Sequence, residues 1–205
     1  MLDRYLLEAQ NALLRPVALQ LSSRGVAADA LTLIGFLFGV GSAIFIATGF
    51  AGTALILIAL NRLFDGLDGA VARLAGPTDR GAFLDIALDF AFYAMVPLAF
   101  AVANPTQNAM AACLLLASFM GTASSFLAFA VIAAKRGATS TSFPQKGIYY
   151  LGGLTEGTET IVAFTAMCLW PNQFPIIATV FSVLALLTTM MRWLWGWREF
   201  SESKL

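Results

Sequence analysis

Histidine is absent from the sequence. This absence excludes His-ligated metal sites and every catalytic triad that uses an imidazole base, so a bound metal ion would need oxygen ligands, which suit Mg²⁺, Mn²⁺ or Ca²⁺. Cysteine is scarce, and the two that occur, Cys113 and Cys168, lie in apolar stretches without a C-x-x-C spacing. We therefore expect both to be small core residues and not disulfide partners.

Charge is also scarce. Only 12% of the 205 residues are charged, whereas 59% are hydrophobic and the mean hydropathy is +0.79. An ordinary soluble domain carries about twice that share of charged residues, so the composition predicts an integral membrane protein whose partner is the lipid bilayer. The formal net charge is zero and the polar segments are short, which indicates neither a separate soluble domain nor a surface that binds nucleic acid.

Long apolar stretches predict membrane spans. Each is close to the roughly 20 residues that a helix needs to cross a bilayer, and glycine or proline marks the breaks, as at Gly76 and Pro105. The predicted spans are residues 31–49, 52–75, 82–103, 109–134, 148–169 and 174–195. We predict an all-α integral membrane protein with a single domain over residues 1–205, in which six transmembrane helices form a bundle within 31–195.

The segment before these spans, residues 1–24, has two faces at helical spacing. The polar face carries Arg4, Glu8, Asn11 and Arg15. The apolar face carries Leu2, Leu6, Ala9, Leu13 and Val17. We predict an amphipathic helix that lies in the membrane interface, because charged residues interrupt the apolar run that a cleavable signal peptide would need.

Basic residues are distributed asymmetrically about the predicted spans. With the N-terminus on the inner side, the inner loops and ends carry nearly all of the lysines and arginines, and the outer loops carry no charge. The exception is Arg62, which lies within a span about one turn before Asp65. The positive-inside rule therefore predicts a cytoplasmic N-terminus and places the end of the second span, with Asp65, near the cytoplasmic face.

Four aspartates form the most distinctive pattern in the chain. Asp65 and Asp68 are three residues apart and Asp85 and Asp89 are four apart, so each pair occupies one face of a helix. A carboxylate in a membrane helix costs roughly 2.5–3.5 kcal/mol even on lenient insertion scales. We predict that the four carboxylates converge and that a pair of divalent metal ions, Mg²⁺ or Mn²⁺, compensates their charge.

Small residues and an arginine accompany these acids. Gly66, Gly69 and Gly81 would let a ligand or a neighbouring helix approach the backbone, and Ala72 extends the same small face. Arg73 follows Gly69 by one turn, where its guanidinium could contact a phosphate oxygen. Paired metal ions usually serve phosphoryl chemistry, so the substrate should contain a phosphate or pyrophosphate. Helix packing and membrane topology remain alternative roles for the small residues and for Arg73.

The pattern D-x-x-D-G-x-x-A-R, a seven-residue spacer and G-x-x-x-D-x-x-x-D resembles the signature of the class I CDP-alcohol phosphotransferases, also called CDP-alcohol phosphatidyltransferases. The matching positions are Asp65, Asp68, Gly69, Ala72, Arg73, Gly81, Asp85 and Asp89. The predicted spans and the amphipathic first helix are similar to the rest of that family's architecture. A Pro-Asn pair that often precedes the first span is replaced here by Ala28 and Asp29.

The resemblance implies transfer of a substituted phosphate from a CDP-linked donor to an alcohol, with release of CMP. The implied metal ligands are Asp65, Asp68, Asp85 and Asp89. Asp89 would also be the catalytic base that takes the proton from the acceptor hydroxyl. The positions that would contact CDP or its phosphates are Gly69, Ala72, Arg73 and Gly81.

Short bacterial members of the family resemble this chain more than the longer relatives that use CDP-choline or CDP-ethanolamine. The expected donor is therefore CDP-diacylglycerol, the expected product is a phospholipid, and the expected location is the bacterial inner (cytoplasmic) membrane. The resemblance also implies a homodimer.

The acceptor alcohol stays open at this point. The candidate acceptor-binding residues are Lys135, Arg136, Lys146, Glu156, Glu159 and Arg192. We favour a phosphorylated acceptor such as glycerol 3-phosphate because of the basic residues, whereas an unphosphorylated polyol or amino alcohol would suit the carboxylates. We expect Glu156 and Glu159 to share an inward face of the fifth span, where they could also pair with Arg192. Lys135 and Arg136 could instead be topology charges.

Two other classes of membrane protein use intramembrane acids. A prenyltransferase also binds metal ions and a pyrophosphate through aspartates, but usually in two separated motifs, and a cation-coupled transporter usually shows internal repeats and broken helices. The acids here form one cluster and no repeat is apparent. Metal-dependent release of CMP would separate the transferase from the transporter.

Overall fold

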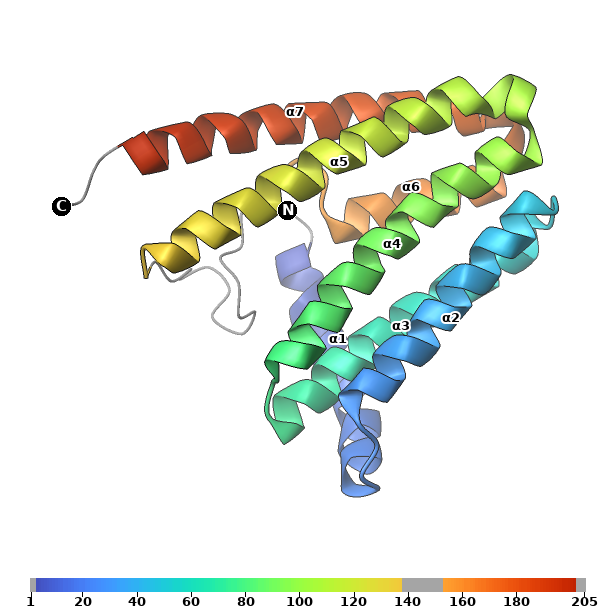
Figure 1. The fold of residues 1–205 in the computed structure, drawn as a ribbon. Helices are drawn as coiled ribbons and strands as arrows, with labels where there is room; N and C mark the ends of the chain where they lie inside the picture. Colours follow the sequence, from blue (N-terminus) through green and yellow to red (C-terminus); the bar gives the residue numbers. More distant parts are fainter. Residues whose placement is uncertain (1–2, 138–152, 202–205) are drawn as a thin grey trace.

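The computed structural model describes residues 3–137 and 153–201, and every regular element in these ranges is a helix (Figure 1). The elements are α1 (Asp3–Ser23), α2 (Ala28–Ala47), α3 (Ala51–Ala75), α4 (Asp79–Ala103), α5 (Pro105–Lys135), α6 (Gly157–Leu169), the short 3₁₀ helix η1 (Pro171–Gln173) and α7 (Phe174–Ser201). The predicted all-α fold is therefore confirmed for the described part of the chain.

Within the described residues, four segments are long and apolar enough to cross a membrane, namely α2, α4, α5 and residues 171–201 with α7. Helix α3 has 25 residues but carries Arg62, Asp65 and Asp68 along its length. Helix α6 has 13 residues, fewer than the roughly 20 that a straight crossing needs. Of the six predicted spans, length and hydropathy thus bear out four, and the predicted fifth span begins outside the described residues.

Local sequence signals set the helix ends. Thr78 caps α4, since its hydroxyl oxygen accepts a hydrogen bond from the Gly81 amide at 3.0 Å, and Asn104 caps α5 by accepting from the Gln107 amide at 3.2 Å. Gly76 ends α3 with a φ of +97°, a backbone conformation that favours glycine. Because the caps start each helix ahead of its apolar run, α4 and α5 begin at residues 79 and 105 and not at the predicted 82 and 109.

The helices form two groups joined by α4. Helix α2 packs on α3 and α4, whereas α5 packs on α7 and α4, and α6 contacts α3 and α7. The connections from α2 to α3, from α4 to α5 and from α6 to α7 lie at the same end of the molecule (Figure 1, right). At that end the Gln107 side chain donates a hydrogen bond to the Asn172 carbonyl at 3.0 Å. The turn from α3 to α4 lies at the opposite end.

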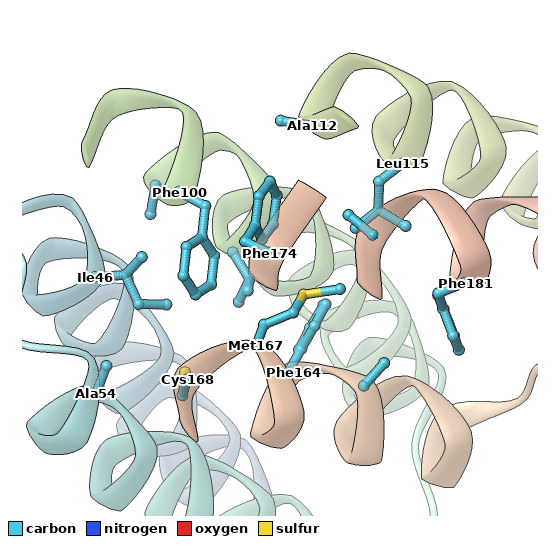
Figure 2. Close-up of a cluster of buried hydrophobic side chains, with 14 of the residues drawn as sticks. Ile46, Ala54, Phe100, Ala112, Leu115, Phe164, Met167, Cys168, Phe174 and Phe181 are labelled. Atoms are coloured by element: carbon cyan, nitrogen blue, oxygen red, sulfur yellow. The ribbon is translucent and has the colours of Figure 1, made fainter. Parts of the chain in front are cut away.

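A buried apolar cluster joins all helices from α2 to α7 (Figure 2). Phe164 of α6 is fully buried and meets Phe92 of α4 edge to face, with ring centroids 6.0 Å apart, and Phe100 stacks on Phe174 at 4.4 Å. Cys168 belongs to this cluster, as predicted. The prediction that Cys113 is a core residue is wrong, since it is exposed on α5. Lipid-facing and buried faces of a membrane helix are equally apolar, so hydropathy could not separate them.

Helix α1 is docked onto the outside of this bundle. Leu14 and Ala18 are buried, and they pack in a second apolar cluster with Leu31, Leu67, Ala70 and Val71 of α2 and α3. Leu13 and Val17, which belong to the apolar face predicted from the sequence, remain exposed. The first helix therefore has an apolar surface left over after it has packed on the protein.

Candidate active site

One pocket between α2, α3 and α4 collects the four signature aspartates. Its lining residues are Thr32, Gly35, Phe36, Asn61, Arg62, Asp65, Asp68, Asp85, Leu88 and Asp89. The helical spacing of each aspartate pair puts its carboxylates on one face, and the packing of α4 beside α3 on α2 brings the two faces to the same pocket. With all carboxylates ionised and Arg62 protonated, the lining carries an excess of negative charge.

Close packing of α2 against α3 shapes the floor of the pocket. A Cβ atom built on Gly35 would lie 3.0 Å from the Cβ of Phe64, so a larger residue would push the two helices slightly apart. Asn61 is buried, and its amide donates a hydrogen bond to the Gly35 carbonyl at 2.8 Å. This bond holds α3 in register with α2 at the level of the aspartates.

Arg62 lies against two of the aspartates. Its Nη2 is 2.7 Å from Oδ1 of Asp89, and its Nη1 is 3.5 Å from Oδ2 of Asp65. The sequence placed Arg62 inside a span but gave it no role. An arginine that lies within an apolar stretch, three residues before an aspartate, is itself a signal for an ion pair with that aspartate. The contact with Asp89 could not be predicted in this way, because it depends on how α3 and α4 pack.

The oxygen donors of the pocket fit a divalent cation. Asp68 is only 5% exposed, and its Oδ2 has no hydrogen-bond partner. A buried carboxylate oxygen without a partner is costly, and a hard divalent cation is the ligand that would satisfy it. Within residues 3–137 and 153–201, however, no three acidic or cysteine side chains are already arranged to hold a metal ion. The predicted metal ligands line one pocket but do not close around a common centre.

The remaining signature residues lie beyond the pocket lining, on both sides of the turn from α3 to α4. The guanidinium of Arg73 folds back over Gly69, where an added Cβ would lie 3.2 Å from Nη1 of Arg73. Ala72 is half-buried on the same helix. A Cβ added at Gly81, in the first turn of α4, would lie 3.2 Å from Oδ1 of Asp29 and from the hydroxyl of Thr78. The backbone of both glycines is therefore closely approached by polar side chains.

Asp29, in the first turn of α2, connects α2 to α4. Its Oδ2 lies 2.6 Å from Nη2 of Arg80 and accepts a hydrogen bond from Nε of Arg80 at 2.7 Å. Arg80 is largely exposed, so this pair adds little to stability. It does bring the start of α2 next to the first turn of α4, beside Gly81.

The candidate acceptor residues lie in the other half of the molecule. Arg136 follows α5 and donates hydrogen bonds to the carbonyls of Glu199 at 3.3 Å and of Phe200 at 2.9 Å. Arg192 is buried on α7 and donates to the Thr122 carbonyl of α5 at 3.0 Å. Both arginines therefore connect α5 with α7. Lys135 is exposed at the end of α5, and Lys146 lies outside the described residues.

The prediction that Glu156 and Glu159 share a face inside the fifth span is wrong. Helix α6 begins at Gly157, and Glu156 is its N-cap residue. The Glu156 amide donates to Oε2 of Glu159 at 3.0 Å, and the Glu156 side chain accepts from the amide of Glu159 in return. Glu156 also accepts from the Gly153 amide at 3.0 Å. This reciprocal capping box satisfies the free amides at the start of the helix.

Comparison with known proteins identifies the sequence family. Residues 25–197 match the family model described as CDP-alcohol phosphatidyltransferase. The inner membrane protein YnjF of Escherichia coli K12 is 50% identical over 192 residues, an alignment that covers 94% of this chain and 93% of YnjF.

Solved structures show the same fold at lower identity. The phosphatidylinositol phosphate synthase PgsA1 of Mycobacterium tuberculosis with CDP-DAG bound has a TM-score of 0.72 and 21% identity, covering 91% of this chain and 94% of that one. The same synthase in complex with manganese and citrate has a TM-score of 0.71 and 22% identity, covering 90% and 88%. At this identity the likeness shows the fold alone.

Proposed function

Because the chain belongs to the CDP-alcohol phosphatidyltransferase family, and is thus a membrane-embedded transferase of substituted phosphate groups, we propose that it transfers the phosphatidyl group of CDP-diacylglycerol to the hydroxyl of a small alcohol and releases CMP. The observation that carries this proposal is the pocket in which Asp65, Asp68, Asp85 and Asp89 meet. The donor assignment is supported by the related synthase from Mycobacterium tuberculosis, whose structure holds CDP-DAG.

In the proposed reaction the acceptor oxygen forms a bond to the phosphorus that carries the diacylglycerol. The bond from that phosphorus to the oxygen of the CMP moiety breaks, and the acceptor proton passes to the carboxylate of Asp89. Asp89 suits this role because it lines the pocket from α4 and is only partly buried, so that a hydroxyl from the aqueous side can reach it within hydrogen-bond distance.

Asp65, Asp68 and Asp85 would hold the divalent cations together with Asp89. Mg²⁺ or Mn²⁺ bound there would supply positive charge to the pyrophosphate and to the attacking and leaving oxygens. The buried oxygen of Asp68 supports this assignment, as does the manganese in the related synthase. Gly69, Ala72 and Gly81 would admit CDP close to the backbone.

The guanidinium of Arg73 would contact a phosphate of the bound CDP. It lies over Gly69, at the end of α3 that faces the turn to α4. Since Gly81 starts α4 on the other side of that turn, the nucleotide would lie across the turn, next to the aspartate pocket. Arginine suits a pyrophosphate because its planar fork can donate two parallel hydrogen bonds.

A phosphorylated acceptor, such as glycerol 3-phosphate, is proposed over an unphosphorylated polyol or amino alcohol. Lys135, Arg136 and Arg192 supply positive charge at the end of α5 and on α7, and the two arginines keep that charge while donating to backbone carbonyls. The side chains of Glu156 and Glu159, by contrast, are both engaged in capping α6. A carboxylate that caps a helix is less suited to bind an amino group or a sugar hydroxyl.

The membrane arrangement of the proposed enzyme follows the charges. Six membrane-embedded helices, α2 to α7, would form a single domain, with the exposed Leu13 and Val17 of α1 facing lipid in the inner interface. The turn from α3 to α4 and the ends of α5 and α7 carry basic residues and would face the cytoplasm of a bacterial inner membrane. A homodimer is proposed from family resemblance.

The decisive experiment is a CMP-release assay with the purified full chain in detergent and CDP-diacylglycerol as donor. Acceptors would include glycerol 3-phosphate, inositol phosphate, glycerol, inositol and serine, each with Mg²⁺, with Mn²⁺ and with a chelator. We expect CMP release that requires metal and is fastest with a phosphorylated acceptor. A folded protein that binds metal yet releases no CMP with any acceptor would exclude the proposed reaction.

A further inference from the structure

Arg62 is a basic side chain among the residues that line the pocket, and it is placed where it contacts two of the proposed metal ligands. It reaches Asp89 at 2.7 Å on another helix and Asp65 at 3.5 Å on its own. A guanidinium between two carboxylates occupies the kind of position that a bridging cation would take. Arg62 is not one of the positions of the family signature.

The guanidinium is held in this position by several neighbours. Its Nε donates a hydrogen bond to Oδ1 of Asn61 at 2.8 Å, and Asn61 is itself fixed to the Gly35 carbonyl. Its Cζ lies 5.0 Å from the ring centroid of the fully buried Phe92 and 5.6 Å from that of Tyr93, distances at which an aromatic face attracts a cation. Arg62 therefore has a built site, which argues against a chance surface contact.

We propose that Arg62 is the resident counter-cation of the aspartate pocket. It holds Asp89 and Asp65 in position while no divalent ion is bound, and it competes with the divalent ion for the same two carboxylates. This inference rests on the proposed function, because it assumes that the pocket takes a divalent cation. Arg62 acts through Asp89 and is thus a positioning residue.

Two opposite effects of removing the guanidinium follow from simple electrostatics. Without metal, Asp89 and Asp65 would lose their positive neighbour and the folded protein should become less stable. With metal, a like charge next to the divalent ion would be gone and the Asp89 carboxylate would be free to bind it, so the metal should bind more tightly. A purely structural role for Arg62 predicts loss of stability together with weaker metal binding.

The test measures binding of Mn²⁺ alone to the full chain in detergent, by the electron paramagnetic resonance signal of free Mn²⁺, together with the melting temperature of metal-free protein. The variants are Arg62→Gln, Arg62→Lys and, as a matched control, Arg80→Gln, which removes a largely exposed arginine paired with Asp29. We expect Arg62→Gln to lower the metal-free melting temperature and to lower the Kd for Mn²⁺ roughly tenfold. Arg80→Gln should leave the Kd unchanged, and Arg62→Lys should lie between Arg62→Gln and the wild type.

An Arg62→Gln variant that folds but binds Mn²⁺ no more tightly than the wild type overturns the inference. Where that variant does not fold, Arg62→Met decides by the same criterion, because methionine is uncharged and its flexible apolar side chain can still pack against Phe92. If the wild type binds no Mn²⁺ at all, the inference is supported when the Arg62→Gln variant does bind Mn²⁺. It is overturned when that variant binds none either. Failure of the proposed function is seen separately, as wild-type protein that binds Mn²⁺ but releases no CMP.

Discussion

Asp89 is the residue on which the proposed chemistry depends, and it has a cation as its neighbour before any substrate arrives. The 2.7 Å contact with Arg62 keeps one of its oxygens directed at the guanidinium. The other oxygen can accept a hydrogen bond from an incoming acceptor hydroxyl, which is the contact that a base needs.

Replacing Asp89 by asparagine tests this role. Asp89→Asn keeps the size of the side chain and can still meet Arg62, so the variant should fold, but an amide cannot take the acceptor proton. We expect the rate of CMP release to fall at least about a hundredfold in a protein that still folds, because Arg62 keeps its contact with Asp65. Asp79→Asn, in the exposed first turn of α4, is the control and should keep its activity. A rate for Asp89→Asn close to that of the wild type would refute the base assignment.

Asp68 gives a second test at the level of one residue. Its buried Oδ2 has no hydrogen-bond partner, so the metal-free protein bears the cost of that oxygen. Asp68→Asn removes a negative charge from a pocket that holds three other carboxylates, so the metal-free protein should melt above the wild type, while the stabilisation by added Mn²⁺ should disappear. Thermal unfolding with and without Mn²⁺ measures both effects. A variant that melts below the wild type without metal would contradict this account of Asp68.

At the scale of elements, the close crossing of α2 with α3 and α4 determines the geometry of the site. A Cβ atom added at Gly39 would lie 2.8 Å from the Phe92 ring and 3.2 Å from the amide nitrogen of Asn61. Both side chains also contact Arg62. The backbone of α2 is therefore packed against the residues that position the guanidinium.

Gly39→Ala should consequently disturb both stability and the site. The added methyl group must displace Phe92, which is fully buried, and overpacking of this kind costs about 1–3 kcal/mol. We expect a lower melting temperature and slower CMP release. Gly52→Ala is the matched control, because nothing lies within 4 Å of its added Cβ, and it should unfold at or above the wild-type temperature. Equal melting temperatures for the two variants would show that the crossing is not as tight as described.

Several element boundaries were predictable, and the reason is local. Breaks such as Gly76 and Pro105 act within a few residues of themselves, so their sequence context is sufficient. The caps Thr78 and Asn104 start α4 and α5 earlier than hydropathy predicted. The start of α6 was not predictable from hydropathy. Glu156 and Glu159 have a spacing compatible both with one face of a longer helix and with a capping box, and only the fold shows that the helix begins at Gly157.

At the scale of the whole molecule, uncharged polar residues gather at one end and basic residues at the other. The end with Gln107 and Asn172 is uncharged at its connections, whereas the turn from α3 to α4 carries Arg80 and the end of α5 is followed by Arg136. This separation predicts that the turn from α3 to α4 is cytoplasmic.

Cysteine labelling in intact cells measures this orientation. In a background with Cys113→Ser and Cys168→Ala, a single Asn172→Cys should react with a membrane-impermeant maleimide, because its position is exposed at the outer end. A single Arg80→Cys should react only after the cells are broken open. Labelling of Arg80→Cys in intact cells, with Asn172→Cys protected, would invert the proposed topology.

The sequence by itself determined the membrane class, most of the helices and the grouping of aspartates into two helix faces. These follow from composition and from the 3.6-residue period, which sets side-chain directions within one helix. Only the tertiary structure decided that both faces line one pocket, that Arg62 meets Asp89 across 27 positions of sequence, and that Arg136 and Arg192 connect α5 with α7. Contacts between membrane helices depend on the packing of surfaces that are equally apolar. Hydropathy therefore cannot predict which helices contact one another.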